Sequence, residues 1–66
     1  MTNEAAITRI TDKLKTARRN QDGAINGNVR HGCYQSLKDT MKANGMDHNE
    51  ACRAAWSTIK ALIEAL

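Results

Sequence analysis

The clearest hydrophobic pattern in the chain lies in its last twenty residues, 47–66. At 100° per residue, seven apolar side chains fall within an arc of about 120°, the width typical of a helix that faces a core. They are Cys52, Ala55, Trp56, Ile59, Leu62, Ile63 and Leu66. Asp47 is a good N-cap, Glu50 completes a capping box, and Met46 and Ala51 suit a hydrophobic staple. The pattern predicts a helix over 47–66.

A narrower apolar seam predicts a first helix over residues 3–19. Its members recur at spacings of three and four and are Ile7, Ile10, Leu14 and Ala17. Thr2 or Asn3 can cap its start. Residues 20–28 contain an Asp-Gly and an Asn-Gly dipeptide, which are strong turn formers. We therefore expect a loop there, with Ile25 as its one anchor to the core.

A second helix is predicted over about residues 28–44. Its apolar residues step by four and are Val29, Cys33, Leu37 and Met41. Gly32 weakens the first turn, and residues 44–46 are typical of a Schellman ending in which Gly45 is left-handed. Because so short a link keeps the two helices together, we expect 28–44 and 47–66 to form an antiparallel helical hairpin.

These elements predict an all-α fold, a small three-helix unit in which the basic first helix lies across the hairpin, in one domain, 1–66. A chain of 66 residues is near the lower limit for independent folding. We therefore expect stability to come from a homodimer or from a larger protein partner. No apolar run is long enough for a signal peptide or a membrane span, which favours a cytoplasmic protein with reduced cysteines and no membrane partner.

The net charge of +3 is concentrated in the first thirty residues. Five basic residues of the first helix are candidates for binding nucleic acid or another acidic partner, namely Arg9, Lys13, Lys15, Arg18 and Arg19. They spread around more than half of the helix and form no stripe. Trp56 is expected in the core and Tyr34 beside it, so neither is expected to stack on bases. A nucleic-acid partner is therefore not favoured.

Two kinds of metal site are suggested by composition, and spacing disfavours both. Aligning Gly23 with the glycine of an EF-hand loop leaves Arg18 and Val29 where two carboxylate ligands belong. Zinc is suggested by two pairs, His31 with Cys33 and His48 with Cys52. The antiparallel hairpin would separate these pairs by roughly 20 Å at 1.5 Å per residue. We expect no metal, no cofactor and no disulfide.

The sequence also lacks the spacings of enzymes and of helix-turn-helix proteins. It has no phosphate loop, no paired carboxylates and no nucleophile with a base, so we expect neither catalysis nor a small-molecule substrate. A helix-turn-helix requires a small residue where Met41 stands, and its recognition helix would offer only Arg53 and Lys60 as basic groups.

What remains are surfaces suited to a protein partner. Opposite the apolar stripe, the last helix carries a strip of small residues that another helix can approach closely, formed by Ala54, Ser57, Ala61 and Ala65. Arg30 lies within the apolar stripe of the second helix, where it either snorkels to solvent or pairs with an acid on a partner.

The expected function follows from these surfaces. It is that of a non-catalytic, protein-binding regulator or inhibitor, such as a phage or plasmid accessory factor that acts on a regulatory or nucleic-acid-handling protein. The alternative is a small DNA- or RNA-binding protein that acts through its N-terminal helix. Because Trp56 is expected in the core, its replacement by alanine is expected to cost about 3–5 kcal/mol under either function.

Overall fold

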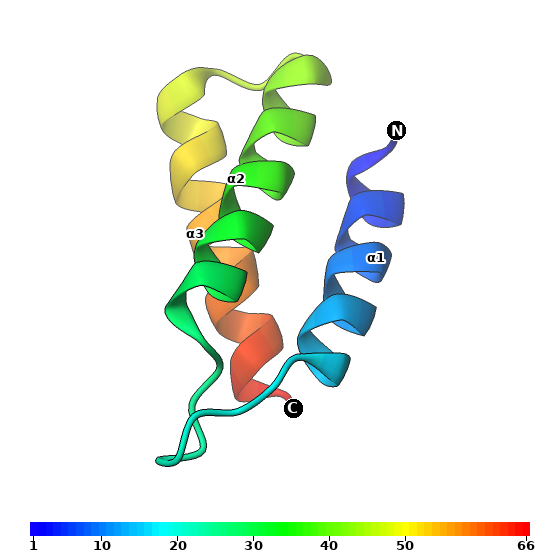
Figure 1. Ribbon diagram of the computed structural model, residues 1–66. Coiled ribbons are helices and arrows are strands. Elements are labelled where there is room, and N and C mark those ends of the chain that lie inside the picture. The colour runs from blue at the N-terminus through cyan, green and yellow to red at the C-terminus, as the bar shows by residue number, and fades with distance from the viewer.

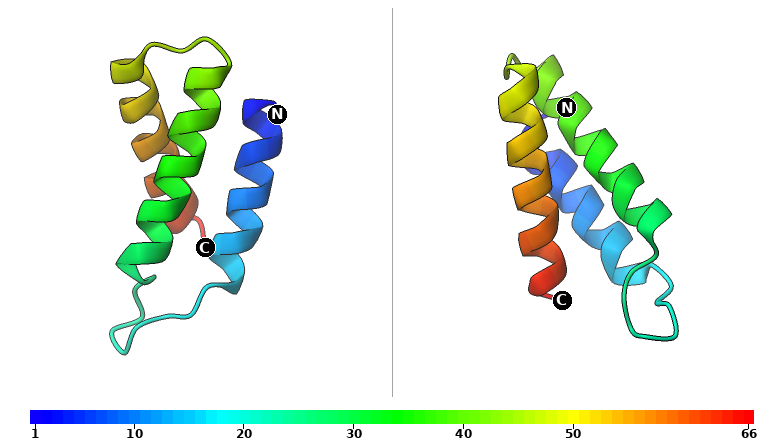
Figure 2. Two further views of the ribbon diagram at one scale, coloured as in Figure 1. Left: turned by 45° about the horizontal axis from the view of Figure 1, so that its top comes forward. Right: turned by 90° about the vertical axis from the view of Figure 1, so that its left-hand side faces the viewer.

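The computed structural model describes residues 1–66 and contains three helices, α1 (Asn3–Thr16), α2 (Gly27–Ala43) and α3 (His48–Glu64). α2 packs against both of the others, and the chain reverses direction at each connection (Figure 1). Figure 2 shows that α2 and α3 cross at an angle, with α1 beside α2. The prediction of an all-α, three-helix fold is confirmed. None of the three helices combines the length and the apolar character needed to cross a membrane.

The first helix begins as predicted but ends earlier. The Thr2 hydroxyl accepts a hydrogen bond from the amide of Ala5 at 3.1 Å, which confirms Thr2 as the N-cap. The expected end at residue 19 is wrong, because the backbone becomes extended at Ala17, with φ −67° and ψ 143°. Arg18 and Arg19 therefore belong to the loop, not to the helix.

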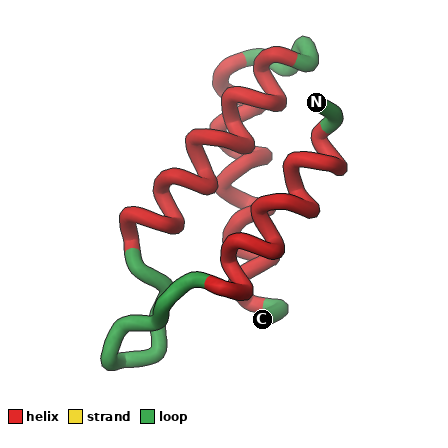
Figure 3. The backbone as a smooth tube through the Cα atoms, turned by 45° about the vertical axis from the view of Figure 1, so that its right-hand side comes forward, coloured by secondary structure: helices red, strands yellow, loops and turns green.

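The loop between α1 and α2 projects beyond the ends of both helices and folds back on itself (Figure 3). It carries Ile25 into the core. Arg19 and Ile25 face each other in an isolated antiparallel bridge. Between them, the Asp22 carboxylate accepts from the amide of Ala24 at 3.0 Å, and Gly23 takes a positive φ of 86°. Ile25 is only 4% exposed, so its predicted role as the anchor of this loop is confirmed.

The link between α2 and α3 is the predicted Schellman ending. Gly45 has φ +101°, the left-handed region that favours glycine. The amide of Met46 donates to the carbonyl of Met41 at 3.0 Å, and that of Gly45 donates to Lys42, also at 3.0 Å. Met46 then folds back onto the core. Two local hydrogen bonds and one apolar contact thus fix where the chain turns.

α3 begins at the predicted N-cap, although the bond differs from that of a capping box. The Asp47 carboxylate accepts from the amide of Asn49 at 3.1 Å rather than from that of Glu50. Met46 and Ala51, the predicted staple pair, both join the core. The side-chain amide of Asn44 ties the end of α2 to the start of α1, donating to the carbonyl of Met1 at 3.0 Å and to the Asn3 side chain at 2.8 Å.

A single core draws on all three helices and on the loop. Its ten buried residues are Ala6, Ile10, Leu14, Ile25, Cys33, Leu37, Met41, Ala51, Ala55 and Ile59. The stripe predicted on α3 is partly wrong, since Trp56 is 51% exposed and Leu66 is 44% exposed, whereas Ala51 is fully buried. Small side chains allow two helices to pack closely, so the alanines occupy the contact and the large indole lies at its flank.

Candidate functional site

The most distinctive surface side chain is Trp56, on the flank of α3 beside α2. Its indole meets the Tyr34 ring edge-on, with ring centroids 5.9 Å apart and planes at 85°. This geometry is favourable for aromatic pairs and restrains both rings. Trp56 therefore presents a half-exposed indole that is held on one side by α2 and is open to solvent on the other.

A shallow hollow of about 280 Å³ lies beside the indole. It is lined by Arg30, Trp56, Ile59, Lys60, Ile63 and Glu64. Arg30 is exposed and comes from α2, whereas the other five residues come from α3. The structure thus brings together an indole, two aliphatic side chains, two cations and one carboxylate. We call Trp56, Tyr34, Arg30, Lys60 and Ile63 the Trp56 face.

Further basic and aromatic groups surround Tyr34. The ammonium group of Lys38 lies 5.6 Å from the centroid of the Tyr34 ring, within the range of a cation–π interaction. The His31 ring lies 6.1 Å from the same ring, with the planes tilted by 40°. The interaction with the Cys52 side chain, followed by desolvation, raises the pKa of the Tyr34 phenol.

The strip of small residues predicted to bind a partner is divided between the core and the surface. Ala54 packs against the core, and only part of it is accessible. Ser57, Ala61 and Ala65 remain exposed. A partner helix that approached this side of α3 would therefore meet three small side chains rather than four.

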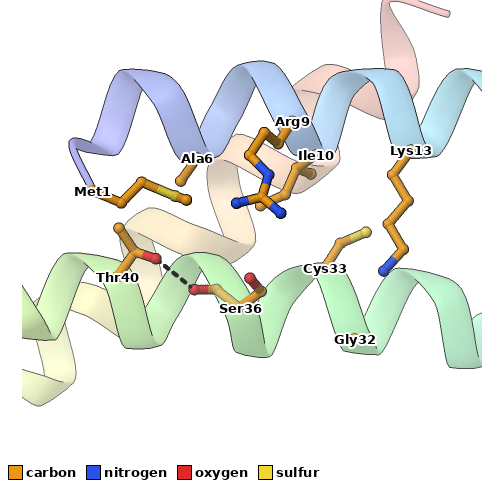
Figure 4. Close-up of a pocket in the computed structure, with 9 residues that line it drawn as sticks. All are labelled: Met1, Ala6, Arg9, Ile10, Lys13, Gly32, Cys33, Ser36 and Thr40. Carbon is orange, nitrogen blue, oxygen red and sulfur yellow. Dashed lines mark hydrogen bonds between the residues drawn. The ribbon is translucent and has the colours of Figure 1, made fainter.

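The five basic residues predicted as a nucleic-acid or acidic-partner site are not gathered in one place. Arg9 and Lys13 extend over a groove of about 360 Å³ between α1 and α2 (Figure 4). Lys15 is exposed on α1 but does not line this groove. Arg18 and Arg19 lie in the loop, where the Arg19 guanidinium donates to a backbone carbonyl at 3.3 Å. The structure therefore shows no continuous basic track along α1.

The cysteines and histidines form one close pair. The Cys52 sulfur lies 3.6 Å from Nε2 of His48, one turn earlier on α3. Cys33 is buried in the core, and both thiols are free. No three side chains of the His, Cys, Asp and Glu types come together in a group that could hold a metal ion.

At pH 8 we expect a thiol reagent to modify Cys52 before Cys33. Burial raises the pKa of the Cys33 thiol, and the nearby Lys13 ammonium acts in the opposite direction. A raised pKa means that the folded state holds the Cys33 thiol proton more tightly than the unfolded state does. The stabilisation that results is complete below the unfolded pKa of about 8.5, and it is lost as the pH rises through the folded pKa. Mass spectrometry of samples quenched over time measures both rates, and faster modification of Cys33 would contradict its burial.

Two features of the surface were not predicted from the sequence. One is the exposure of Trp56, for which a signal existed in the small residues Ala51 and Ala55, placed one turn apart as a close helix contact requires. The other is the α1–α2 groove, whose two walls come from separate helices, so that the sequence of neither helix alone predicts it.

Comparisons of the chain with protein-family models, with curated proteins and with solved structures give no match.

Proposed function

We propose that this chain is a non-catalytic, protein-binding regulator or inhibitor that docks on a larger protein through the Trp56 face. The observation that carries the proposal is the half-exposed Trp56, held by Tyr34 and flanked by Arg30 and Lys60. Trp, Tyr and Arg are the residue types most enriched among those that contribute most of the binding energy at interfaces. The docking unit in this proposal is the antiparallel hairpin of α2 and α3, whose two helices both contribute to the face.

The charges of the Trp56 face favour an acidic partner. Arg30 and Lys60 line the hollow with the indole, and Glu64 is the one acid among the lining residues. Lys38, next to the Trp56 face, adds a third cation at the Tyr34 ring. An apolar group inserted beside Trp56 and acids at its rim would complement this surface. Such charge complementarity contributes mainly to specificity and to the rate of association.

The exposed area of the chain also favours association. The molecule exposes 4545 Å², compared with about 4,200 Å² expected of a folded monomer of 7.3 kDa. Only ten residues are buried. A partner that covers the Trp56 face would add the burial that the small core lacks. A homodimer is the second form of association that we propose. Native mass spectrometry of the purified protein measures its mass and so distinguishes a homodimer from a monomer that binds a different protein.

Replacing Trp56 with alanine should abolish partner capture while leaving the fold intact. Truncating a central aromatic anchor costs at least about 2 kcal/mol of binding, roughly thirtyfold in affinity. Because half of the side chain is already exposed, we expect the stability cost to be about 1–2 kcal/mol, not the 3–5 kcal/mol of a core residue. The measurement is quantitative capture from the native host by tagged wild-type and variant proteins, with circular dichroism of both.

The matched controls lie on the other side of α3. Ser57→Ala removes only the hydroxyl group of a neighbouring exposed side chain and should leave capture unchanged. Ala61→Arg tests the strip of small residues. If Ala61→Arg loses capture and Trp56→Ala keeps it, the docking surface is that strip and not the Trp56 face.

DNA or RNA binding is the second candidate, and one observation favours it. An exposed indole beside Arg30 and Lys60 can stack on a base, which a buried indole could not do. Nucleic-acid binding through this face, or through the basic residues of α1, requires affinity that falls steeply with added salt. Charge reversal of Arg18 and Arg19 should abolish binding through the N-terminal segment and leave protein docking at the Trp56 face unchanged.

A further inference from the structure

The α1–α2 groove is a second concave site, separate from the Trp56 face. It has a volume of about 360 Å³ and lies between the two helices, with lining residues from Ala6 to Lys13 on α1 and from Gly32 to Thr40 on α2 (Figure 4). Ala6 and Ile10 give it an apolar floor, and Cys33 contributes its side chain from α2. The volume falls within the range of sites that hold small ligands.

The charge of this groove is uncompensated. Arg9 and Lys13 stand one turn apart on α1, and both side chains reach over the groove toward α2 in Figure 4. None of the nine residues that line the groove is acidic. Two like charges at this spacing weaken the helix that carries them, so helix stability does not explain the arrangement. The groove thus holds two positive charges above an apolar floor, where an anion would be attracted more strongly than at a flat surface.

The wall opposite these cations carries hydroxyl groups. Ser36 and Thr40 stand one turn apart on α2 and both line the groove. The Thr40 hydroxyl donates to the Ser36 carbonyl at 3.0 Å. Figure 4 shows the Ser36 hydroxyl pointing across the groove toward α1. It is therefore placed to donate a hydrogen bond to an anion that also meets Arg9 and Lys13.

Gly32 keeps this wall open. It lies inside α2, where glycine weakens a helix relative to any residue with a side chain except proline. Neither a positive φ nor a close packing contact requires it, since a Cβ atom built at Gly32 meets nothing within 4 Å. What the missing side chain does provide is free space in the groove.

We propose that the α1–α2 groove binds the phosphate group of a small phosphorylated ligand. The Arg9 guanidinium can pair with two phosphate oxygens, the Lys13 ammonium supplies the second charge, and the Ser36 hydroxyl donates a further hydrogen bond. A phosphate monoester carries close to two negative charges at pH 7 and so matches the two cations better than a carboxylate does. The volume left beyond one phosphate accommodates the group that is attached to it.

The test is a titration of the full chain followed by nuclear magnetic resonance, with four probes. We expect AMP and inorganic phosphate to shift the signals of Arg9, Lys13 and Ser36, and we expect adenosine to shift none of them. Arg9→Gln and Lys13→Gln should each weaken AMP binding at least about tenfold, as the loss of a charge-assisted contact predicts. Lys15→Gln is the matched control, because it removes the same charge from α1 outside the groove, and it should bind AMP like the wild type. Equal losses with Lys13→Gln and Lys15→Gln would overturn the proposal in favour of general attraction to a basic surface.

Gly32→Leu separates binding from folding. Leucine is the better helix former, so this variant should melt about 3–6 °C higher than the wild type. It should nonetheless bind AMP at least about tenfold more weakly, because the new side chain occupies the groove. Unchanged AMP binding by Gly32→Leu would overturn the proposal.

The fourth probe, an oligothymidylate without terminal phosphates, tests the source of the phosphate. A small ligand is supported if AMP displaces the oligonucleotide or if the oligonucleotide leaves the groove signals unshifted. Oligonucleotide binding at Arg9 and Lys13 that AMP cannot displace would overturn the proposal and assign the groove to nucleic acid. Since Trp56 lies on another face, Trp56→Ala should bind AMP normally, so failure of this proposal and failure of the proposed protein docking are distinguishable.

Discussion

Replacing Leu37 with alanine should remove a large part of the protein's free energy of unfolding. Leu37 is 0% exposed and lies in the middle of α2, the helix that packs against both of the others. Truncation of a fully buried leucine costs about 2–5 kcal/mol, because it removes apolar contacts and leaves a cavity. A 66-residue domain has a free energy of unfolding of roughly 3–10 kcal/mol in total. This substitution therefore removes a large part of the stability, which urea denaturation followed by circular dichroism measures.

Leu66→Ala provides the matched control for this prediction. It makes the same chemical change at a residue that is 44% exposed and lies beyond the end of α3. Surface changes of this kind usually alter stability by no more than about 0.5 kcal/mol. Similar losses at Leu37 and at Leu66 would show that α2 is not the central helix of the core.

The second large effect is expected at Ala51, where leucine should destabilise the fold by about 1–3 kcal/mol through overpacking. Ala51 is 0% exposed and lies in the first turns of α3, near the link to α2. A longer side chain there must push α3 away from its neighbour or adopt a strained rotamer. The midpoint of urea denaturation reports the loss directly.

Ala61→Leu distinguishes overpacking from a general effect of leucine on α3. Ala61 is exposed on the same helix, and we expect the change there to be within about 0.5 kcal/mol. Comparing Ala51→Leu with Ala61→Leu also tests which face of α3 is buried, that is, how the helix is rotated about its own axis. If the stripe predicted from periodicity were the buried one, leucine at position 51 would be tolerated and Trp56→Ala would carry the larger cost.

The local features of the fold were predictable because they depend on residues close together in the sequence. The Schellman ending at Gly45 and the N-caps at Thr2 and Asp47 each require a few specific residues and hydrogen bonds between groups two to five positions apart in the sequence. The anchoring of Ile25 follows similarly, since it is the one large apolar residue between two turn-forming dipeptides. The end of α1 was not predicted, because the extended bridge between Arg19 and Ile25 competes with further helix and depends on where the loop packs.

By itself, the sequence of this protein determined that there are three helices, roughly where they begin and end, and that they share one small core. Periodicity and capping suffice for this because they act within a few residues. Only the tertiary structure decided the rotation of α3, and with it the exposure of Trp56 beside Arg30. It also decided that Arg9 and Lys13 face Ser36 across a groove. These placements depend on how closely two helices can approach, which is set by the volumes of side chains on both helices and cannot be derived from either helix alone.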